Sequence, residues 1–404
     1  MWLAILGVAL VLTAVGIVYL ISRFGRFAVV RRLAGNRRSL RILLGAVPVA
    51  ALAVYGIFDL VNMVIILLHL AAFWLIADLA TGLFSILKKR KMKTPAAPSD
   101  APDSSAPPRP YITGIIVLVV CAVYLAVGRY NAFHVDRTEY CLETSKELPG
   151  GQLRILLIAD SHVGTTFDAD GFAEHLAEAM KDDPDIVIVA GDFIDDSTTR
   201  EDMLAACRAL GGLTPKYGVY FSYGNHDKGY NNSRGYTPQE LEAALTASGV
   251  HVLEDEVELV ADTFYVIGRM DRSDSSRRRN GAGNSGDNSA NNGDNNGTGG
   301  RRSIADLTKE LDRSRYMIDI NHQPNDYEAE AAAGVDLVLS GHTHGGQLIP
   351  LGPIGRLMGA NDRTYGLETR GETTFIVTSG ISDWEIHYKT GTKSEYVIIE
   401  IRQK

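Results

Sequence analysis

The sequence predicts an α/β protein that follows an α-helical membrane domain of about four transmembrane helices. Three observations predict this division. Three apolar blocks lie within the first 129 residues, and from Gln152 onward short β-branched runs alternate with helix-like stretches. Residues 1–129 also carry 14 Lys and Arg against four Asp, a net charge of +10, which leaves −18 for the rest of a chain whose total is −8.

This composition excludes several classes of protein. The apolar blocks exclude a wholly soluble chain, and the acidic soluble part would repel the phosphates of a nucleic acid, so no nucleic-acid partner is implied. Three cysteines are too few for a disulfide scaffold. Whether Cys141 and Cys207 pair in an oxidising compartment stays open.

The membrane domain, residues 1–129, is predicted to cross the bilayer at about 2–22, 42–58, 63–87 and 112–128. A crossing needs about 20 apolar residues, so the apolar block 42–87 is too long for one helix. Polar residues interrupt this block around Gly56 and Asp59, which predicts two helices joined by a short turn. The first block has no cleavage signal after it and is read as a retained span.

The charges of the loops predict the topology. Residues 23–41 hold seven Arg and no acid, and residues 88–93 read KKRKMK. By the positive-inside rule both lie in the cytoplasm, with 88–110 as a flexible cytoplasmic linker. One more span follows, so residues 130–404 are expected outside the cytoplasm, in a multi-pass protein of the cell membrane.

The soluble part alternates strands with helices, and one segment breaks the pattern. Residues 271–302 contain no Val, Ile, Leu, Met or aromatic side chain, which predicts a disordered insertion. The predicted strands are 153–159, 185–191, 219–224, 258–268, 316–320, 336–341, 374–380 and 396–401. The predicted helices are 171–181, 201–211 and 238–249.

Five groups of metal-type ligands stand just after predicted strands, where open α/β sheets place their sites. Their joint order, D-x-H, G-D-x-x-D, G-N-H-D, a lone H and G-H-T-H-G-G-Q, is far more specific than any one of them. Two divalent metals about 3.5–4 Å apart can clamp a phosphoryl oxygen. A mixture of imidazole and carboxylate favours Mn, Fe or Zn. The groups are Asp160 and His162; Asp192 and Asp195; Asn225, His226 and Asp227; His322; His342 and His344.

These motifs resemble the calcineurin-like metallophosphoesterases, and within them a membrane-anchored bacterial branch whose motif series ends in S-G-H-T-H-G-G-Q. The resemblance covers residues 153–404 apart from the insertion. It implies a four-layer sandwich, with two mixed β-sheets flanked by helices. Two departures are the insertion and the N-H-Q-P sequence at His322, where an acidic residue often follows the histidine.

The resemblance also implies a role for each residue. Asp192 would bridge two metals, and His226, not a ligand, would act near the leaving group with Asp227 orienting it. Asp195 and Gln347 would have supporting roles, and Tyr230 and Trp384 are candidates for the pocket wall. One metal would be held by Asp160, His162, Asp192 and His344, and the other by Asp192, Asn225, His322 and His342.

The function expected from these observations is a membrane-anchored, dinuclear metal-dependent phosphohydrolase. A metal-activated hydroxide would attack a phosphoester or pyrophosphate of a phosphorylated small molecule or a lipid-linked substrate in the membrane. A UDP-2,3-diacylglucosamine-type pyrophosphatase of lipid A synthesis is the alternative, but it requires a cytoplasmic site. A catalytically silent membrane sensor or binding protein would have lost ligands, and none is lost.

Overall fold

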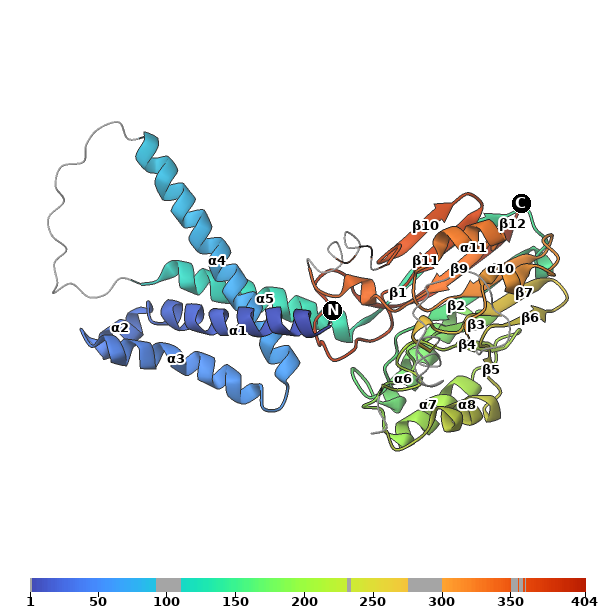
Figure 1. Cartoon of the computed structure of the whole chain (residues 1–404), viewed down its shortest axis with the longest axis horizontal. Coiled ribbons are helices and arrows are strands. Elements are labelled where there is room, and N and C mark those ends of the chain that lie inside the picture. Colours follow the sequence, from blue (N-terminus) through green and yellow to red (C-terminus); the bar gives the residue numbers. More distant parts are fainter. Residues whose placement is uncertain are drawn as a thin grey trace, which may run out of the picture. The chain divides into compact units, whose positions relative to one another are not determined.

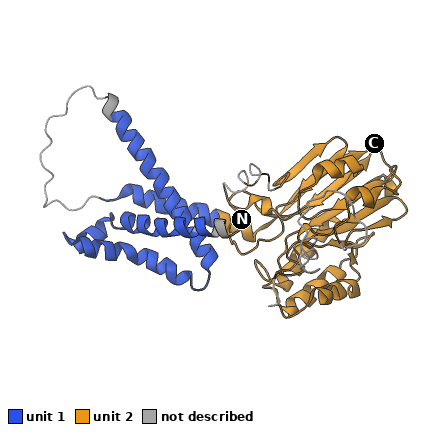
Figure 2. Ribbon diagram, in the orientation of Figure 1, with its two compact units in different colours: residues 1–127 blue, residues 128–404 orange. Residues whose placement is uncertain are grey.

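The chain divides into two compact units, residues 1–127 and 128–404 (Figure 2). The computed structural model describes residues 2–91, 110–230, 234–274, 300–349, 355, 359 and 361–404. Most of the expected linker 88–110 and of the expected insertion 271–302 lies outside these described residues.

The described part of the N-terminal unit is helical (Figure 1). Three described helical segments, Arg38–Tyr55, Leu60–Lys88 and Ile112–Phe133, are long and apolar enough to cross a membrane. A fourth candidate is a pair bent by 78°, Leu10–Phe24 with Ala28–Ala34. The helices are α1 (Trp2–Phe24), α2 (Ala28–Ala34), α3 (Arg38–Tyr55), α4 (Leu60–Lys91) and α5 (Ile112–Phe133).

A small apolar core and one glycine hold these helices together. Trp74 of α4 is fully buried and packs with Leu20, Val49, Leu67 and Val117. A Cβ added at Gly45 of α3 would lie 2.6 Å from the carbonyl oxygen of Ile21 in α1. The missing side chain therefore permits the close approach of α1 and α3, as small residues do between membrane helices.

The second unit contains two six-stranded mixed sheets, ordered β1-β12-β2-β3-β4-β5 and β10-β11-β9-β8-β7-β6. Parallel and antiparallel pairs occur in both sheets. The strands are β1 (Val135–Thr144), β2 (Gln152–Ile158), β3 (Ile186–Ala190), β4 (Val219–Ser222), β5 (His251–Val252), β6 (Glu256–Val260), β7 (Phe264–Gly268), β8 (Tyr316–Ile320), β9 (Leu337–Ser340), β10 (Gly366–Arg370), β11 (Thr373–Val377) and β12 (Ser394–Gln403).

Side chains of alternate strand residues build three apolar layers. Leu156 and Ile158 of β2 pack under helices α6 (Ala169–Ala179), α7 (Arg200–Gly211) and α8 (Pro238–Ala247). Ile155 and Leu157 point the other way, into the core between the two sheets. The outer face of the second sheet packs against α10 (Ile304–Thr308) and α11 (Tyr327–Ala333). The predicted four-layer sandwich is therefore confirmed.

The single strand predicted at 258–268 was wrong, because this stretch folds into the hairpin β6–β7. Val260 pairs with Phe264, and Thr263 N–H donates to the Val260 carbonyl at 3.0 Å. Ala261 and Asp262 between them have φ of 51° and 55°, which is the backbone of a type I′ turn. Neither residue is the glycine or asparagine that usually marks this turn, so the sequence does not indicate that the strand is interrupted here.

Two further strands, β1 and β10, had no apolar signal in the sequence. β1 lies at a sheet edge and pairs in parallel with β12, from Val135 opposite Ser394 to Thr144 opposite Gln403. Its side chains alternate between half-buried and exposed positions, and many are charged. The short helices α10 and α11 were missed as well, because neither has enough turns to show a helical period.

Candidate metal centre

The five predicted ligand groups come together at the carboxyl ends of central strands from both sheets. Asp160, Asp192 and Asn225 follow β2, β3 and β4, while His322 and His342 follow β8 and β9. Five of the seven predicted ligands have a positive φ, between 37° and 69°: Asp160, His162, Asp192, His342 and His344. Such a backbone is costly for residues other than glycine and gathers at functional sites.

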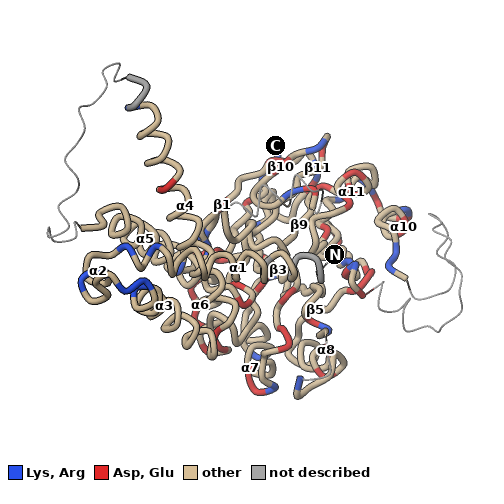
Figure 3. The backbone as a smooth tube through the Cα atoms, turned by 60° about the vertical axis from the view of Figure 1, so that its left-hand side comes forward, with Lys and Arg blue, Asp and Glu red and all other residues tan. Residues whose placement is uncertain are grey.

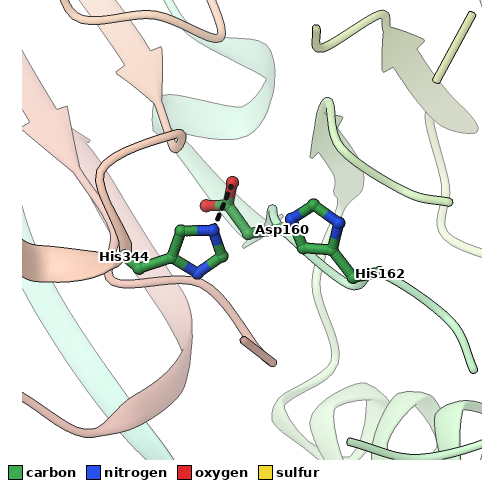
Figure 4. A group of neighbouring side chains, drawn as sticks. All are labelled: Asp160, His162 and His344. Atoms are coloured by element: carbon green, nitrogen blue, oxygen red, sulfur yellow. Dashed lines mark ion pairs between the residues drawn. The ribbon is translucent and has the colours of Figure 1, made fainter. Parts of the chain in front are cut away.

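The first ligand group is Asp160, His162 and His344, whose ligand atoms lie within 4.8 Å of one another (Figure 4). His344 Nε2 is 3.9 Å from Asp160 Oδ1. The rings of His162 and His344 stack with centroids 5.3 Å apart. All three residues are buried.

The second ligand group is Asp192, His322 and His342, with ligand atoms within the same 4.8 Å limit. His322 Nε2 lies 3.1 Å from Asp192 Oδ2. The same Oδ2 is 3.8 Å from His162 Nε2 of the first group. Asp192 therefore faces both groups, which is the position that a bridging carboxylate requires.

Asn225 adds an amide oxygen whose orientation is set by a neighbour. Its Nδ2 donates to the hydroxyl of Tyr230 at 2.6 Å, which leaves Oδ1 as the atom directed elsewhere. That Oδ1 is buried and has no hydrogen-bond partner within the described part of the chain. An amide oxygen held in this way is suited to bind a cation.

The unpartnered atoms of the site test whether these residues fit metals. Buried polar atoms are almost always hydrogen-bonded, so a cluster of exceptions needs a cause. Among the described residues these ligand atoms are buried without a partner: His162 Nδ1 and Nε2, Asn225 Oδ1, His322 Nε2 and His342 Nδ1. Imidazole nitrogens, an amide oxygen and carboxylates in two adjoining groups fit two divalent metal ions.

The pKa of His322 also indicates that a positive charge is favoured at this position. Burial opposes protonation, but Asp192 raises the pKa of His322 to about 10. His322 Nδ1 meets the Ala190 carbonyl at 2.7 Å, so Nε2 is the nitrogen that faces Asp192. A cation at this position would replace the proton, as metal binding to histidine generally does.

Two glycines of the motifs lie where a side chain would clash with a ligand carboxylate. A Cβ at Gly224 would lie 2.2 Å from Asp192 Oδ1. A Cβ at Gly341 would lie 2.5 Å from Asp160 Oδ2. The G-N-H-D and G-H-T-H motifs therefore begin with glycine because the ligand carboxylates occupy the place of a side chain.

Asp227 has contacts that differ from the role implied by the resemblance. Its two carboxylate oxygens accept backbone N–H bonds from Asp192, Phe193, Ile194 and Gly224, at 2.7–3.1 Å. The contacts of the described residues include no bond from this carboxylate to the His226 ring. Burial and the neighbouring Asp192 raise the pKa of Asp227 to about 7. Three of these donors lie in the turn that carries Asp192 and the fourth, Gly224, follows β4, so Asp227 fixes the Asp192 turn and ties it to the loop after β4.

The His226 ring stands beside the two ligand groups. Its centroid lies 5.0 Å from that of His162, 4.9 Å from Tyr230 and 5.1 Å from Trp384. Its backbone N–H donates to Asp192 Oδ1 at 2.8 Å. Burial lowers the pKa of His226 to about 4, so the imidazole is neutral at pH 7.

A carboxylate lies near the Nδ1 atom of each histidine in the first ligand group. Asp195 Oδ2 is 3.6 Å from His162 Nδ1, and Asp383 Oδ1 is 3.7 Å from His344 Nδ1. Asp383 in turn pairs with the fully buried Lys389 at 3.1 Å. Such partners orient metal-binding imidazoles. Gln347 differs, since its Nε2 donates to the Ile386 carbonyl at 2.9 Å and so ties two loops together.

Sequence reasoning missed Asp383 and Lys389. A signal was present, because the S-G-I-S-D stretch after the strand at 374–380 places a carboxylate at a strand end, like the other ligand groups. Lys389 carried no signal, since its Nζ is held mainly by backbone carbonyls of Ser379 and Ser382.

The sequence of the second unit is similar to known proteins. Residues 153–346 match the family profile of the calcineurin-like phosphoesterases. A metallophosphoesterase of Aquifex aeolicus is 29% identical over 286 residues, which are 69% of this chain and 96% of the relative. A metallophosphoesterase of Bacillus subtilis is 24% identical and covers 71% of this chain and 97% of its own length.

Two further matches are a longer relative and a solved structure. A transmembrane protein with metallophosphoesterase domain from Danio rerio is 28% identical over 73% of this chain, which spans 63% of that relative. A dimetal phosphatase of known structure, also from Danio rerio, shares 15% identity with a TM-score of 0.34, over 56% of this chain and 86% of the other.

Proposed function

We propose that this chain is a membrane-anchored enzyme that uses two divalent metals to cleave a phosphoester or pyrophosphate bond. It carries a calcineurin-like phosphoesterase domain and is a phosphoesterase hydrolase. One observation carries the proposal. Two groups of buried ligand atoms adjoin each other across Asp192 Oδ2, with their free nitrogens and amide oxygen unsatisfied by the described chain.

The residues divide the work of the site. Asp160, His162 and His344 would hold one metal, Asn225, His322 and His342 the other, and Asp192 both. When bound, two such metals supply Lewis acidity toward the phosphoryl oxygens and lower the pKa of water. Asp195 and Asp383 keep the imidazoles of His162 and His344 oriented, since each carboxylate lies within 3.7 Å of a ring nitrogen.

His226 is proposed to act on the leaving group. Its ring is packed among His162, Tyr230 and Trp384, and 55% of Tyr230 and 37% of Trp384 are exposed, so this side of the site is open to solvent. A substrate phosphate beside the ring raises its pKa, since an anion favours the charged imidazole. The protonated ring can then donate to the departing oxygen.

The membrane anchor and the side of the membrane are also proposals. They are supported by the three or four apolar helices and by the basic loops 23–41 and 88–93. With the catalytic unit outside the cytoplasm, a lipid-linked phosphate, a wall polymer or a nucleotide diester would be within reach. Manganese is the first metal to try, because it suits mixed imidazole and carboxylate ligands.

Activity of the metal-loaded full chain tests the function. The purified protein is freed of metal with a chelator and assayed with an aryl phosphomonoester, an aryl phosphodiester and a pyrophosphate after adding Mn, Co, Fe or Zn. We expect hydrolysis that depends on the metal and vanishes with the chelator. Background rates with every metal and every substrate class would contradict the proposal.

Cysteine labelling of intact cells tests the topology. Single cysteines are placed by Gly35→Cys, Asp100→Cys or Ser285→Cys in a chain whose own three cysteines are replaced. An impermeant thiol reagent should reach only position 285. Labelling at 35 or 100 but not at 285 would invert the orientation and favour the cytoplasmic UDP-lipid pyrophosphatase.

A further inference from the structure

A basic cavity lies within the N-terminal unit, formed by residues of that unit alone. Its volume is about 840 Å³, within the range of roughly 300–1,000 Å³ that pockets for small ligands occupy. The end of α1, the turn after it, α2, the start of α3 and the residues just before α5 form its walls. Four arginines line it: Arg26, Arg31, Arg38 and Arg41.

Three of the four arginines of this cavity have no acidic partner among the described residues, and Arg26 has only a distant one. Arg23, which does not line the cavity, pairs with Asp78 at 2.6 Å. Arg26 reaches the same carboxylate only at 4.0 Å. Among the described residues, no carboxylate pairs with the other three, and no acidic residue is among those that line the cavity. Figure 3 shows the basic residues gathered along α2 and the start of α3.

The remaining walls are apolar and open. Val18 and Ile42 line the cavity with 70% and 52% of their surfaces exposed. Tyr111 adds an aromatic ring, with the Arg26 guanidinium 6.0 Å from its centroid. A ligand that matches this cavity must therefore carry a negative head and an apolar body.

We propose that this cavity binds an anionic phospholipid, with the phosphodiester of the headgroup between the arginines and the acyl chains along Val18 and Ile42. Guanidinium groups bind phosphate through paired N–H donors, and basic pockets between membrane helices on the cytoplasmic side are suited to acidic headgroups. The inference rests on the proposed membrane anchoring. It does not depend on the catalytic chemistry, and its test does not use activity.

Neighbouring arginines provide a matched control. Arg32 and Arg37 lie next to Arg31 and Arg38 in sequence and do not line the cavity. The variant Arg31→Gln/Arg38→Gln therefore removes two charges from the cavity. The variant Arg32→Gln/Arg37→Gln removes two charges from the same segment and leaves the cavity intact. Both pairs are exposed, so neither change disturbs a buried contact.

The experiment measures lipid retention by the full chain in detergent, by native mass spectrometry, with dioleoylphosphatidylglycerol, dioleoylphosphatidylcholine and inorganic phosphate as separate probes. We expect the original chain to retain phosphatidylglycerol over phosphatidylcholine. The cavity variant should lose affinity for phosphatidylglycerol by about tenfold or more, and the control variant by less than about twofold.

Three results would overturn the proposal. Equal losses in the two variants would show a diffuse attraction of the basic segment for anionic lipid and no site. Binding of inorganic phosphate as tight as that of the lipid would show that the apolar walls contribute nothing. Lipid binding that appears only after Asp100→Asn/Asp103→Asn would mean that the chain segment with these two aspartates occupies the cavity in place of a lipid. A chain that does not enter detergent micelles would instead contradict the membrane anchoring.

Discussion

Two buried assemblies of charged side chains in the second unit differ in what faces their carboxylates. In the candidate metal centre, Asp160 and Asp192 face imidazole rings, at 3.1–3.9 Å. In a second assembly, next to the ends of β7 and β8, the buried Asp319 and Glu330 face the guanidinium of Arg269, at 3.8 and 3.9 Å. Among the described residues, no Lys or Arg pairs with the carboxylates of the first assembly, whereas Arg269 pairs with those of the second.

The second assembly extends to another arginine. Arg301 Nη1 pairs with Asp326 at 2.7 Å, and its Nη2 donates to Asn321 at 2.8 Å. The comparison teaches that burial of carboxylates alone does not mark a metal site. The candidate metal centre differs because its carboxylates lie beside imidazoles and an amide with unsatisfied atoms, and no Lys or Arg among the described residues pairs with Asp160 or Asp192.

The largest expected effect is that of Asp192→Ala. Because Asp192 faces both ligand groups, its loss should lower bound metal below one ion per chain and abolish hydrolysis. Elemental analysis after dialysis measures the metal, and circular dichroism checks that the fold persists. A variant that keeps two metals would show that Asp192 does not bridge them.

His226→Ala should remove activity without removing metal. Positioned acid–base groups contribute roughly 10²–10⁴-fold in rate. The ring lies beside the ligand groups, so metal content should stay that of the unaltered chain. The kcat and the metal stoichiometry are measured on the same sample. Loss of metal in this variant would make His226 a ligand.

Arg269→Met should lower the stability of the fold and leave metal binding unchanged, the reverse of the effect expected for Asp192→Ala. Breaking a buried ion pair leaves an uncompensated charge, which typically lowers the free energy of unfolding by about 3–5 kcal/mol. Metal affinity of the folded protein should not change. Asp319→Asn added to Arg269→Met should restore a part of the stability. A stable Arg269→Met variant with weakened metal binding would show that the two assemblies are not separate.

Asp383→Asn should have an intermediate effect, on metal affinity. Removal of a carboxylate that orients a metal-binding histidine typically costs about 10–100-fold in affinity. Asp336→Asn is the matched control, since Asp336 also pairs with a lysine, Lys146, at 2.7 Å, and neither residue belongs to the ligand groups. Calorimetric titration with Mn compares them. Equal affinities in both variants would limit Asp383 to stabilising the fold.

The smallest effect is expected from shortening the insertion, and the structure narrows its bounds. Met270 N–H and Arg302 N–H donate to the two oxygens of the same carboxylate, Asp255. Asp271 and Asp274 are buried, and Asp274 pairs with Lys228 at 2.9 Å. The expected segment 271–302 thus has anchored ends, because short polar side chains bind the chain there without apolar contacts.

Two deletions test these bounds. Removal of 275–299 with a short linker should change neither stability nor turnover, since closing a surface loop costs little entropy. Removal of 271–302 should destabilise the unit, because it takes Asp271, Arg301 and Arg302 from the second assembly and its surroundings. Thermal unfolding of both variants makes the comparison. Equal midpoints would contradict the anchoring role.

The sequence pattern predicted strands alternating with helices in the second unit and ligand motifs at strand ends, while the resemblance to a known family implied the four layers. The pattern succeeded where signals are local, as in the all-apolar β3 and in the placement of the H-T-H motif just after β9. It failed where the partner is distant in the chain. β1 is a strand because β12 lies beside it, and Lys389 is buried because carbonyls of a remote turn surround its ammonium group.

The parallel pairing of β1 with β12 has a mechanical consequence. β1 begins two residues after α5, and β12 ends at the last residue but one of the chain. Tension between the N-terminal helices and the C-terminus pulls these two strands in opposite directions along their common axis. Their ten paired positions, from Val135–Ser394 to Thr144–Gln403, are then loaded in shear, all at once rather than one after another.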